Sequence, residues 1–485
     1  MKEDTLKNKT VKGVGWSAAD ALLGQGVTFM VGIVLARLLS PSEYGVIGIC
    51  LIFNTVLNSI VDSGFSNSLI RKTNVNNDDY NTMFFTNLLV SIVLYLILFF
   101  LSPYISSFFR IHELISLIRV TGLILIINAL SIVQVTILTK RIDFKTKTKA
   151  SLFSAIISGF IGILMAILNF GIWALAMQLL LKQILYTTSL WIFNKWIPQL
   201  NFSKTSFKYM WGFGSKIMLS GLLNNIWNQL NQVVVGKFYN PYTLGQFTRS
   251  SQYASIFSEN ITAIVQRVSY PILAEIQDDK IRMLTVYRKI IKTTMFITCI
   301  CMFFIAAVSE PLIYCLIGDK WHEAAIYLPL ICINMSLYPL HAINLNMLQI
   351  NGRSDIMLVL EIIKKIISVA PILVGIFIGV YWMLVVNIGT GLISYFLNSW
   401  YTGKKMGYSS INQLLDVTPY YGIAIFIAIS VYFFKFLLLD NWIILLIQIT
   451  VCVSILFILN SIIGIPELKQ LIEILYNTLT KHKKL

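Results

Sequence analysis

The stretch "RLLSPSEYG", from Arg37 to Gly45, returns in altered form 200 residues later as "KFYNPYTLG", from Lys237 to Gly245. Both copies read as a basic residue, two bulky residues, a small polar residue, proline, two variable residues, a bulky residue and glycine. Each copy separates two long apolar runs. A pattern repeated at this distance predicts a duplicated chain with an equivalent turn in each copy.

The local chemistry of both stretches is that of a helix start. Ser40 is suited to the N-cap position, Pro41 to the first helical position and Glu43 to the closing position of a capping box. Asn240 and Pro241 are their counterparts in the second copy. The basic residue that opens each copy ends the preceding helix, where a cation complements the helix C-terminus. We assign these tight structural corners to Arg37, Ser40, Pro41, Glu43 and Gly45, and to Lys237, Asn240, Pro241 and Gly245.

Composition places the chain in a membrane. Its 485 residues are 56% hydrophobic and only 12% charged, whereas soluble domains carry about 25% charged residues. Apolar runs long enough to cross ~30 Å of hydrocarbon recur from end to end. The N-terminal dozen residues are polar and resemble no cleavable signal, so we expect the first span to stay in the protein. The net charge of +16 fits cytoplasmic loops better than nucleic-acid binding.

Apolar periodicity predicts fourteen transmembrane helices. They cover residues 14–37, 43–69, 83–108, 114–138, 148–169, 172–194, 209–236, 243–272, 284–316, 324–349, 355–378, 380–402, 419–438 and 442–464. With this count, lysine and arginine concentrate in every second loop, as the positive-inside rule requires. Both termini are then cytoplasmic, and the protein is expected to be a multi-pass membrane protein.

A second pair of motifs supports the duplication. "LTKRIDF" (138–144) follows the fourth predicted helix, and "LQINGRSDI" (348–356) follows the tenth. Helices one to six and seven to twelve are therefore predicted to be two copies in the same orientation, related by an axis along the membrane normal. This all-α architecture divides into a lobe at 1–200, a lobe at 201–405, and a segment at 406–485 with two further helices and a cytoplasmic tail.

Polar residues concentrate on the first two helices of each repeat, which predicts that these helices face a shared hydrophilic space. Amides suit sugar hydroxyls, and cations suit phosphate. The predicted substrate-binding residues are Arg249, Lys216, Lys182, Arg119, Asn225, Asn228, Gln252 and Glu259.

Structural roles compete with these assignments. Lys182 is equally suited to pair with Asp20 or Glu259, and Arg119 is close enough to the surface to extend to the interface. The amides of residues 209–236 are also suited to bonds between helices. Asp20 and Asp62 are candidates to bind a coupling H⁺ or Na⁺, or else to cap neighbouring helices.

No enzymatic motif is present. The sequence has no Walker loop, no spaced metal ligands and no nucleophile elbow. We therefore expect neither an enzyme nor a bound metal or cofactor, apart from a coupling ion. Transport would draw on an ion gradient, the membrane potential or the gradient of the substrate.

"VLARLLSPSEYGVIGI", "LTKRIDFKTKTKA" and "LNMLQINGRSDI" resemble the bacterial polysaccharide exporters, or lipid-linked oligosaccharide flippases. The nearest branch contains the colanic acid and teichuronic acid exporters, within the superfamily that also includes the MATE drug exporters and the lipid II flippase. The resemblance covers nearly the whole chain.

The resemblance implies two six-helix lobes that alternate between inward-open and outward-open states. It also implies an undecaprenyl-diphosphate-linked repeat unit as substrate, a role in capsule, O-antigen or exopolysaccharide synthesis, and a polymerase and glycosyltransferases as partners. We expect a monomer. Flippases of this superfamily hold the diphosphate with cations from helices 1, 2 and 8; here only Arg249 matches. A cation-coupled MATE-type drug exporter is the alternative, and a scaffold without transport activity fits the polar faces less well.

Overall fold

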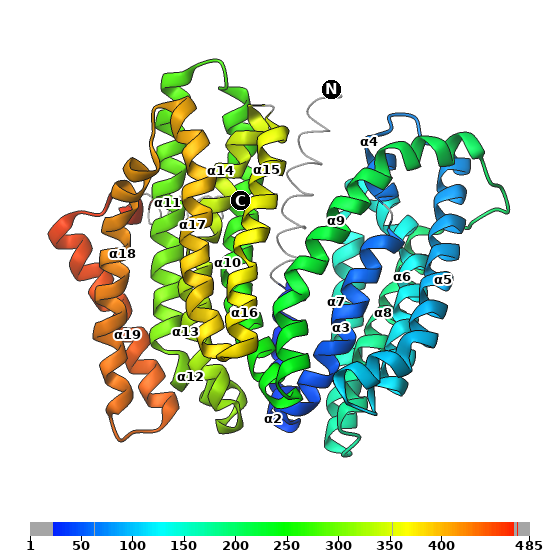
Figure 1. The fold of residues 1–485 in the computed structure, drawn as a ribbon, viewed down its shortest axis with the longest axis horizontal. Helices are drawn as coiled ribbons and strands as arrows, with labels where there is room; N and C mark the ends of the chain where they lie inside the picture. The colour runs from blue at the N-terminus through cyan, green and yellow to red at the C-terminus, as the bar shows by residue number, and fades with distance from the viewer. Residues whose placement is uncertain (1–22, 63, 352, 470–472, 474–485) are drawn as a thin grey trace, which may run out of the picture. The chain divides into compact units, whose positions relative to one another are not determined.

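The computed structural model describes residues 23–62, 64–351, 353–469 and 473, and within these ranges the chain is almost entirely helical (Figure 1). The described residues contain no β-strand. The helices group into two compact units, residues 1–245 and 246–485. The predicted all-α fold is confirmed.

The first unit holds eight helices among its described residues. They are α2 (Gln25–Leu38), α3 (Pro41–Val61), α4 (Phe65–Arg71), α5 (Asn77–Phe109), α6 (Leu114–Lys140), α7 (Phe144–Ile167), α8 (Ile172–Asn194) and α9 (Lys204–Phe238). Because α9 lies against α3, α4 and α5, the packing boundary falls after Gly245. The boundary predicted at residue 200 is a different one, because it separates the two sequence repeats rather than two packed units. It stays a prediction.

The second unit contains most of α10 and all later elements. They are α10 (Pro241–Glu275), α11 (Lys280–Ala307), α12 (Ser309–Ile317), η2 (Asp319–Trp321), α13 (His322–Met335), α14 (Tyr338–Ile350), α15 (Ser354–Ile367), α16 (Val369–Phe377), α17 (Val380–Met406), α18 (Ser410–Tyr432), η3 (Phe433–Phe436) and α19 (Asn441–Ile463). Its largest core cluster joins buried residues of α10, α11, α14, α17 and α18, among them Tyr287 and Tyr395.

Each predicted helix has a helical counterpart, but four predictions of unbroken helices were wrong. The span 43–69 is interrupted at Gly64, whose φ of 66° is left-handed. The other three interruptions each come three residues before a proline. They lie at Val308 before Pro311, at Ser336 before Pro339 and at Ser368 before Pro371. Proline removes a backbone donor and clashes with the carbonyl one turn earlier, so these helices restart.

The helix predicted at 419–438 was wrong at its start, since α18 begins at Ser410. The Ser409 side chain accepts a bond from the Asn412 N–H and caps the helix. Within its first two turns, Asp416 forms ion pairs with Arg288 and Lys292 of α11. Burial, together with the hydrogen bond to Asp416, raises the pKa of the Tyr408 phenol. A polar helix start is thus stabilised by tertiary contacts that hydropathy does not detect.

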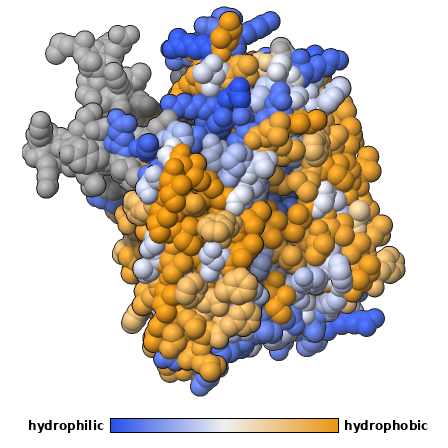
Figure 2. Space-filling model, turned by 90° about the vertical axis from the view of Figure 1, so that its left-hand side faces the viewer, coloured by the Kyte–Doolittle hydropathy of each residue, from blue (hydrophilic) through white to orange (hydrophobic). Residues whose placement is uncertain are grey.

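The surface of the second unit is that of a membrane protein. Figure 2 shows a broad apolar band between two hydrophilic ends on the side that carries α18 and α19. Large side chains such as Phe426, Leu446 and Phe457 are exposed there. Within the described ranges, nine helical stretches are long and apolar enough to cross a membrane. The protein is multi-pass, while the count of fourteen crossings stays a prediction.

Small residues let the helices of the first unit approach closely. Along α7 they recur every four residues, as Ser154, Ser158, Gly162 and Ala166, all of them buried. A Cβ atom at Gly162 would lie 2.8 Å from the Gln178 side chain of α8. Such stripes permit van der Waals contact between backbones in a bilayer, where the hydrophobic effect does not drive helix association.

The two repeated stretches both cap helices. Ser40 is the N-cap of α3: its hydroxyl accepts the Glu43 N–H, and the Glu43 carboxylate accepts the Ser40 N–H at 2.7 Å. Asn240 accepts the Thr243 N–H at 2.8 Å at the start of α10. Lys237 donates to the Phe108 carbonyl, in the last turn of α5. The second cation therefore serves a neighbouring helix end.

The two corners also contact each other through their glycines. A Cβ atom added to Gly45 would lie 1.8 Å from the carbonyl oxygen of Pro241. One added to Gly245 would lie 1.9 Å from the carbonyl oxygen of Pro41. Each glycine thus contacts the first residue of the other helix, and the contact is reciprocal. Backbone oxygens cannot rotate away as side chains do, so only glycine fits either position.

We expect Gly45→Ala and Gly245→Ala each to destabilise the protein by more than the ~1–3 kcal/mol typical of overpacking. The matched control is Gly221→Ala in α9, where an added Cβ atom meets nothing within 4 Å. The yield of monodisperse protein after detergent extraction should fall for both corner variants and stay at the wild-type level for Gly221→Ala. Normal yield of Gly45→Ala would contradict the reciprocal contact.

Candidate functional site

Lys182 projects from α8 toward α2, where its ammonium donates to the Thr28 hydroxyl at 3.1 Å. Thr28 in turn donates to the Gly24 carbonyl. Among the described residues no carboxylate forms an ion pair with Lys182, and Asp20 lies outside these residues. Among the described residues the hydrogen bond of Lys182 thus goes to a neutral hydroxyl, and its role in binding an anion stays a prediction.

Three amides form a chain across α3, α6 and α8. Asn128 donates to the Asn58 carbonyl oxygen at 2.9 Å and accepts from the Gln183 amide at 3.3 Å. Gln183 also lies 3.4 Å from the hydroxyl of Thr187. Sequence reasoning did not select Asn128 and Gln183, although a polar amide within a largely apolar helix was a usable signal. Gln183 directly follows Lys182 in the sequence. The network therefore holds amides, which suit sugar hydroxyls, one residue away from this cation.

Asp62 caps the end of α3, at the break before α4. The Ser66 hydroxyl donates to its carboxylate at 2.6 Å, and Thr136 of α6 donates to Ser66 at 3.1 Å. The carboxylate is half-buried, and no ion pair to a described cation is found. It therefore has both a capping role and free acceptor capacity.

Arg119 has structural partners. Its Nε donates to the Ser102 hydroxyl at 3.1 Å, and its guanidinium carbon lies 4.1 Å from the centroid of the Phe99 ring. Both partners belong to α5, so this cation fastens α6 to α5 through a hydrogen bond and a cation–π contact. This geometry favours the structural alternative for Arg119.

Three predicted residues lie along α9. Lys216 and Asn228 are exposed and Asn225 is half-buried, although they occur in the middle of the helix. Asn225 and Asn228 are three residues apart and therefore share a face. If α9 crosses the membrane as predicted, a charged group exposed at this position requires water or a polar ligand beside it.

The second unit contributes Arg249, Gln252 and Glu259, all from α10. Arg249 is buried, with 5% of its surface exposed, and it donates to the Gln252 side chain at 2.5 Å. Gln252 and Glu259 are exposed and lie seven residues apart, on one face. The start of α10 is fixed by Gln246, which donates to the Lys320 carbonyl and accepts the Ala324 N–H. A fixed helix thus presents these polar groups.

A buried hub in the second unit was missed by sequence reasoning. Asn344 accepts the Tyr287 hydroxyl at 2.9 Å and bonds the Gln413 amide at 3.1 Å, and all three residues are fully buried. The hub joins α11, α14 and α18. Complete mutual satisfaction of buried polar groups is the mark of a structural network.

The described residues hold no group of three or more His, Cys, Asp or Glu side chains that fits a metal ion. The predicted residues fall into two sets, described unit by unit. Lys182, Lys216, Asn225, Asn228 and Asp62 belong to the first unit, and Arg249, Gln252 and Glu259 to the second. Arrangements of this composition bind hydroxyls and anions.

Solved structures define the fold class. Lipid II flippase MurJ in an inward closed conformation superimposes with a TM-score of 0.70 at 17% identity, over 94% of this chain and 100% of that one. An inward-facing multidrug resistance MATE family transporter gives a TM-score of 0.62, also at 17% identity, over 82% and 99% of the two chains. The chain therefore shares the fold of these two transporters.

Sequence comparison identifies the family. The model of polysaccharide biosynthesis proteins matches residues 34–326. Succinoglycan biosynthesis transport protein ExoT of Rhizobium meliloti is 24% identical over 422 residues, covering 86% of this chain and 83% of that one. Teichuronic acid biosynthesis protein TuaB of Bacillus subtilis is 23% identical over 358 residues, 73% of each chain. The chain belongs to the polysaccharide biosynthesis protein family.

A double-mutant cycle tests the amide chain. We expect Asn128→Leu and Gln183→Leu each to lower the thermal unfolding midpoint, and the double variant to lose less than the sum, because each single variant leaves the other amide unpaired. The coupling should be about 0.5–1.5 kcal/mol. Thr188→Leu, an exposed polar residue on α8, is the control and should leave the midpoint unchanged. Strict additivity would show that the two amides do not interact.

Proposed function

We propose that the protein is a flippase that moves an undecaprenyl-diphosphate-linked oligosaccharide across the cytoplasmic membrane for surface polysaccharide synthesis. Membership of the polysaccharide biosynthesis family supports this proposal. The names of its relatives point the same way, since one is a succinoglycan transport protein and another a teichuronic acid biosynthesis protein. Transport, rather than enzymatic catalysis, is the proposed activity.

Among the described residues, cations on polar helices without a described carboxylate partner are the observation that carries the proposal. Lys182 has a hydroxyl as its partner, and Lys216 is exposed within α9. The substrate head would bring phosphate to such cations and hydroxyls to amides such as Asn225 and Gln252. The prenyl tail would remain in lipid, because moving it through a polar space has no energetic benefit.

A MATE-type multidrug exporter shares the fold, so the fold does not distinguish the two functions, and the charge of the site is a second criterion beside the family. Cationic drugs require carboxylates in the cavity. Here Lys182, Lys216 and Arg249 outnumber Asp62 and Glu259 among the candidate residues described. The charge balance therefore favours an anionic substrate.

The remaining features of the mechanism belong to the same proposal. Transport proceeds by alternating access, with both termini in the cytoplasm and with H⁺ or Na⁺ as the coupling ion. Asp62 is the described candidate for that ion, because its carboxylate holds a hydroxyl rather than a cation. A polymerase and glycosyltransferases would supply and consume the lipid-linked unit, and the transporter acts as a monomer.

Arg249 provides the sharpest test of substrate binding. Removing a charge-assisted bond to phosphate costs about 1.5–3 kcal/mol, so Arg249→Ala should reduce transport roughly 10- to 100-fold. The assay is complementation of a deletion strain, with surface polysaccharide and the lipid-linked intermediate both measured. Arg282→Ala, an exposed arginine at the start of α11, should complement fully. Membrane insertion of every variant is checked by immunoblot.

The deletion strain also separates the two functions. A flippase predicts loss of surface polysaccharide and accumulation of the lipid-linked unit inside the cell. Normal polysaccharide with greater sensitivity to cationic dyes would replace the proposal with the drug exporter. Full complementation by Arg249→Ala would remove this arginine from the mechanism and leave the flippase function standing.

A further inference from the structure

The second unit contains a cavity of about 600 Å³ that none of the candidate transport residues lines. Side chains of α11, α12, α13, the start of α17, α18 and η3 surround it. Alanines leave the space open, namely Ala306, Ala307, Ala325 and Ala428. The space is open to its surroundings on one side and its lining is mainly apolar, so an apolar ligand can enter it.

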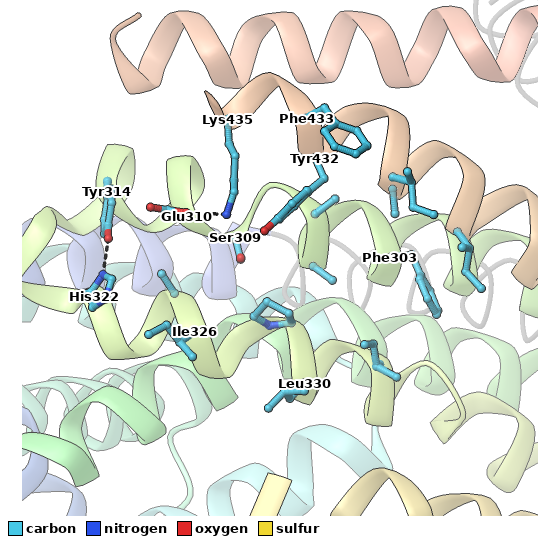
Figure 3. A pocket seen from close by; sticks show the side chains of 18 of the residues that line it. Phe303, Ser309, Glu310, Tyr314, His322, Ile326, Leu330, Tyr432, Phe433 and Lys435 are labelled. Carbon is cyan, nitrogen blue, oxygen red and sulfur yellow. Dashed lines mark hydrogen bonds and ion pairs between the residues drawn. The ribbon is translucent and has the colours of Figure 1, made fainter. Parts of the chain in front are cut away.

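The cavity is polar at one end and apolar along its length. Figure 3 shows Glu310, Tyr314, His322 and Lys435 toward one end, with Phe303 toward the other. The His322 ring nitrogen lies 2.5 Å from the Tyr314 hydroxyl. An occupant that matches this division has a polar head and a hydrocarbon body.

The length of the cavity matches one leaflet of a bilayer. Ile425, which lines the apolar part, precedes Lys435 by ten residues, and Phe303 precedes Glu310 by seven. The first interval ends in η3 and the second passes the break at Val308, so at ~1.5–2.0 Å per residue they correspond to roughly 10–20 Å. Half of a hydrocarbon core of ~30 Å is about 15 Å. One acyl chain therefore fits the apolar part while its headgroup stays at the membrane surface.

Two opposite charges at the polar end select the headgroup. The Lys435 ammonium lies 3.3 Å from the Glu310 carboxylate, and the two side chains are 21% and 44% exposed. Lys435 also lies 4.2 Å from the centroid of the Tyr432 ring. The phosphate of a headgroup would be attracted to Lys435, and an ammonium group to Glu310. A headgroup with a net negative charge would instead be repelled by the Glu310 carboxylate. The pair is complementary to a zwitterion.

We infer that this cavity binds one acyl chain of a zwitterionic, phosphoethanolamine-type phospholipid, with its headgroup on Glu310 and Lys435. The bound lipid fills the space between α18 and the helices α11 to α13 and so supports the packing of α18. The site is independent of the proposed transport function, because Arg249, Lys182 and the other candidate residues take no part in it.

Native mass spectrometry of the full-length protein in detergent tests the site with two lipids of identical chains, phosphatidylethanolamine and phosphatidylglycerol. We expect the wild type to retain phosphatidylethanolamine about tenfold more strongly, as one charge-assisted contact implies. Ala428→Trp should abolish retention by filling the cavity. Phe426→Trp, which changes an exposed position of α18 outside the cavity lining, should retain the lipid.

Glu310→Gln separates headgroup selection from filling of the cavity. This variant should still bind lipid but lose the preference for phosphatidylethanolamine. Equal retention of both lipids by the wild type would overturn the proposal, as would a preference for phosphatidylglycerol or unchanged retention by Ala428→Trp. The wild-type comparison requires no variant, so misfolding of a variant leaves the test intact. Transport assays do not enter the result.

Discussion

The reciprocal contact between Gly45 and Gly245 is the constraint on which the arrangement of the polar helices depends. Each glycine lies against the first carbonyl of the other helix, so α3 and α10 must start side by side. The caps at Ser40 and Asn240 fix where those helices begin. Since α2 and α9 end just before the caps, their last turns lie next to the first turns of α3 and α10. The two copies of the repeated motif thus pack against each other.

Electrostatics divides the intramembrane cations by their partners. Arg119 is satisfied by a hydroxyl and an aromatic face, which makes it a structural link. Among the described residues Lys182 donates to the neutral hydroxyl of Thr28, and Lys216 is exposed. A bilayer penalises unneutralised charge, so a protein retains such groups only beside water or an anion. The same reasoning gives Asn344 a structural role, because all its hydrogen-bonding groups have partners. The exposed amides of α9 remain available to a ligand or to water.

Much of the fold could be predicted from the sequence. Apolar length located the helices, and the turn chemistry of Ser40, Pro41 and Asn240 located two of their starts. The breaks at Val308, Ser336 and Ser368 escaped because prolines within membrane spans do not lower hydropathy enough to divide them. The early start of α18 depends on Asp416 and its partners in α11, which are distant in sequence. The sequence repeat would assign α9 to the second lobe, but its packing against α3, α4 and α5 places it in the first unit. Such packing cannot be read from the repeat.

The candidate site was predictable in its chemistry but less so in its partners. Rare cations and amides in apolar helices predict polar surfaces whatever their contacts. Lys182 and Arg249 were selected on that ground, and their roles stay predictions. Whether such a charge is used or neutralised depends on side chains that the fold brings from other helices. Thr28 and Ser102 are both ordinary hydroxyls in the sequence, yet one leaves Lys182 able to bind an anion and the other helps to fasten Arg119 to α5. Function in this family of folds therefore depends on which cations the packing leaves unsatisfied.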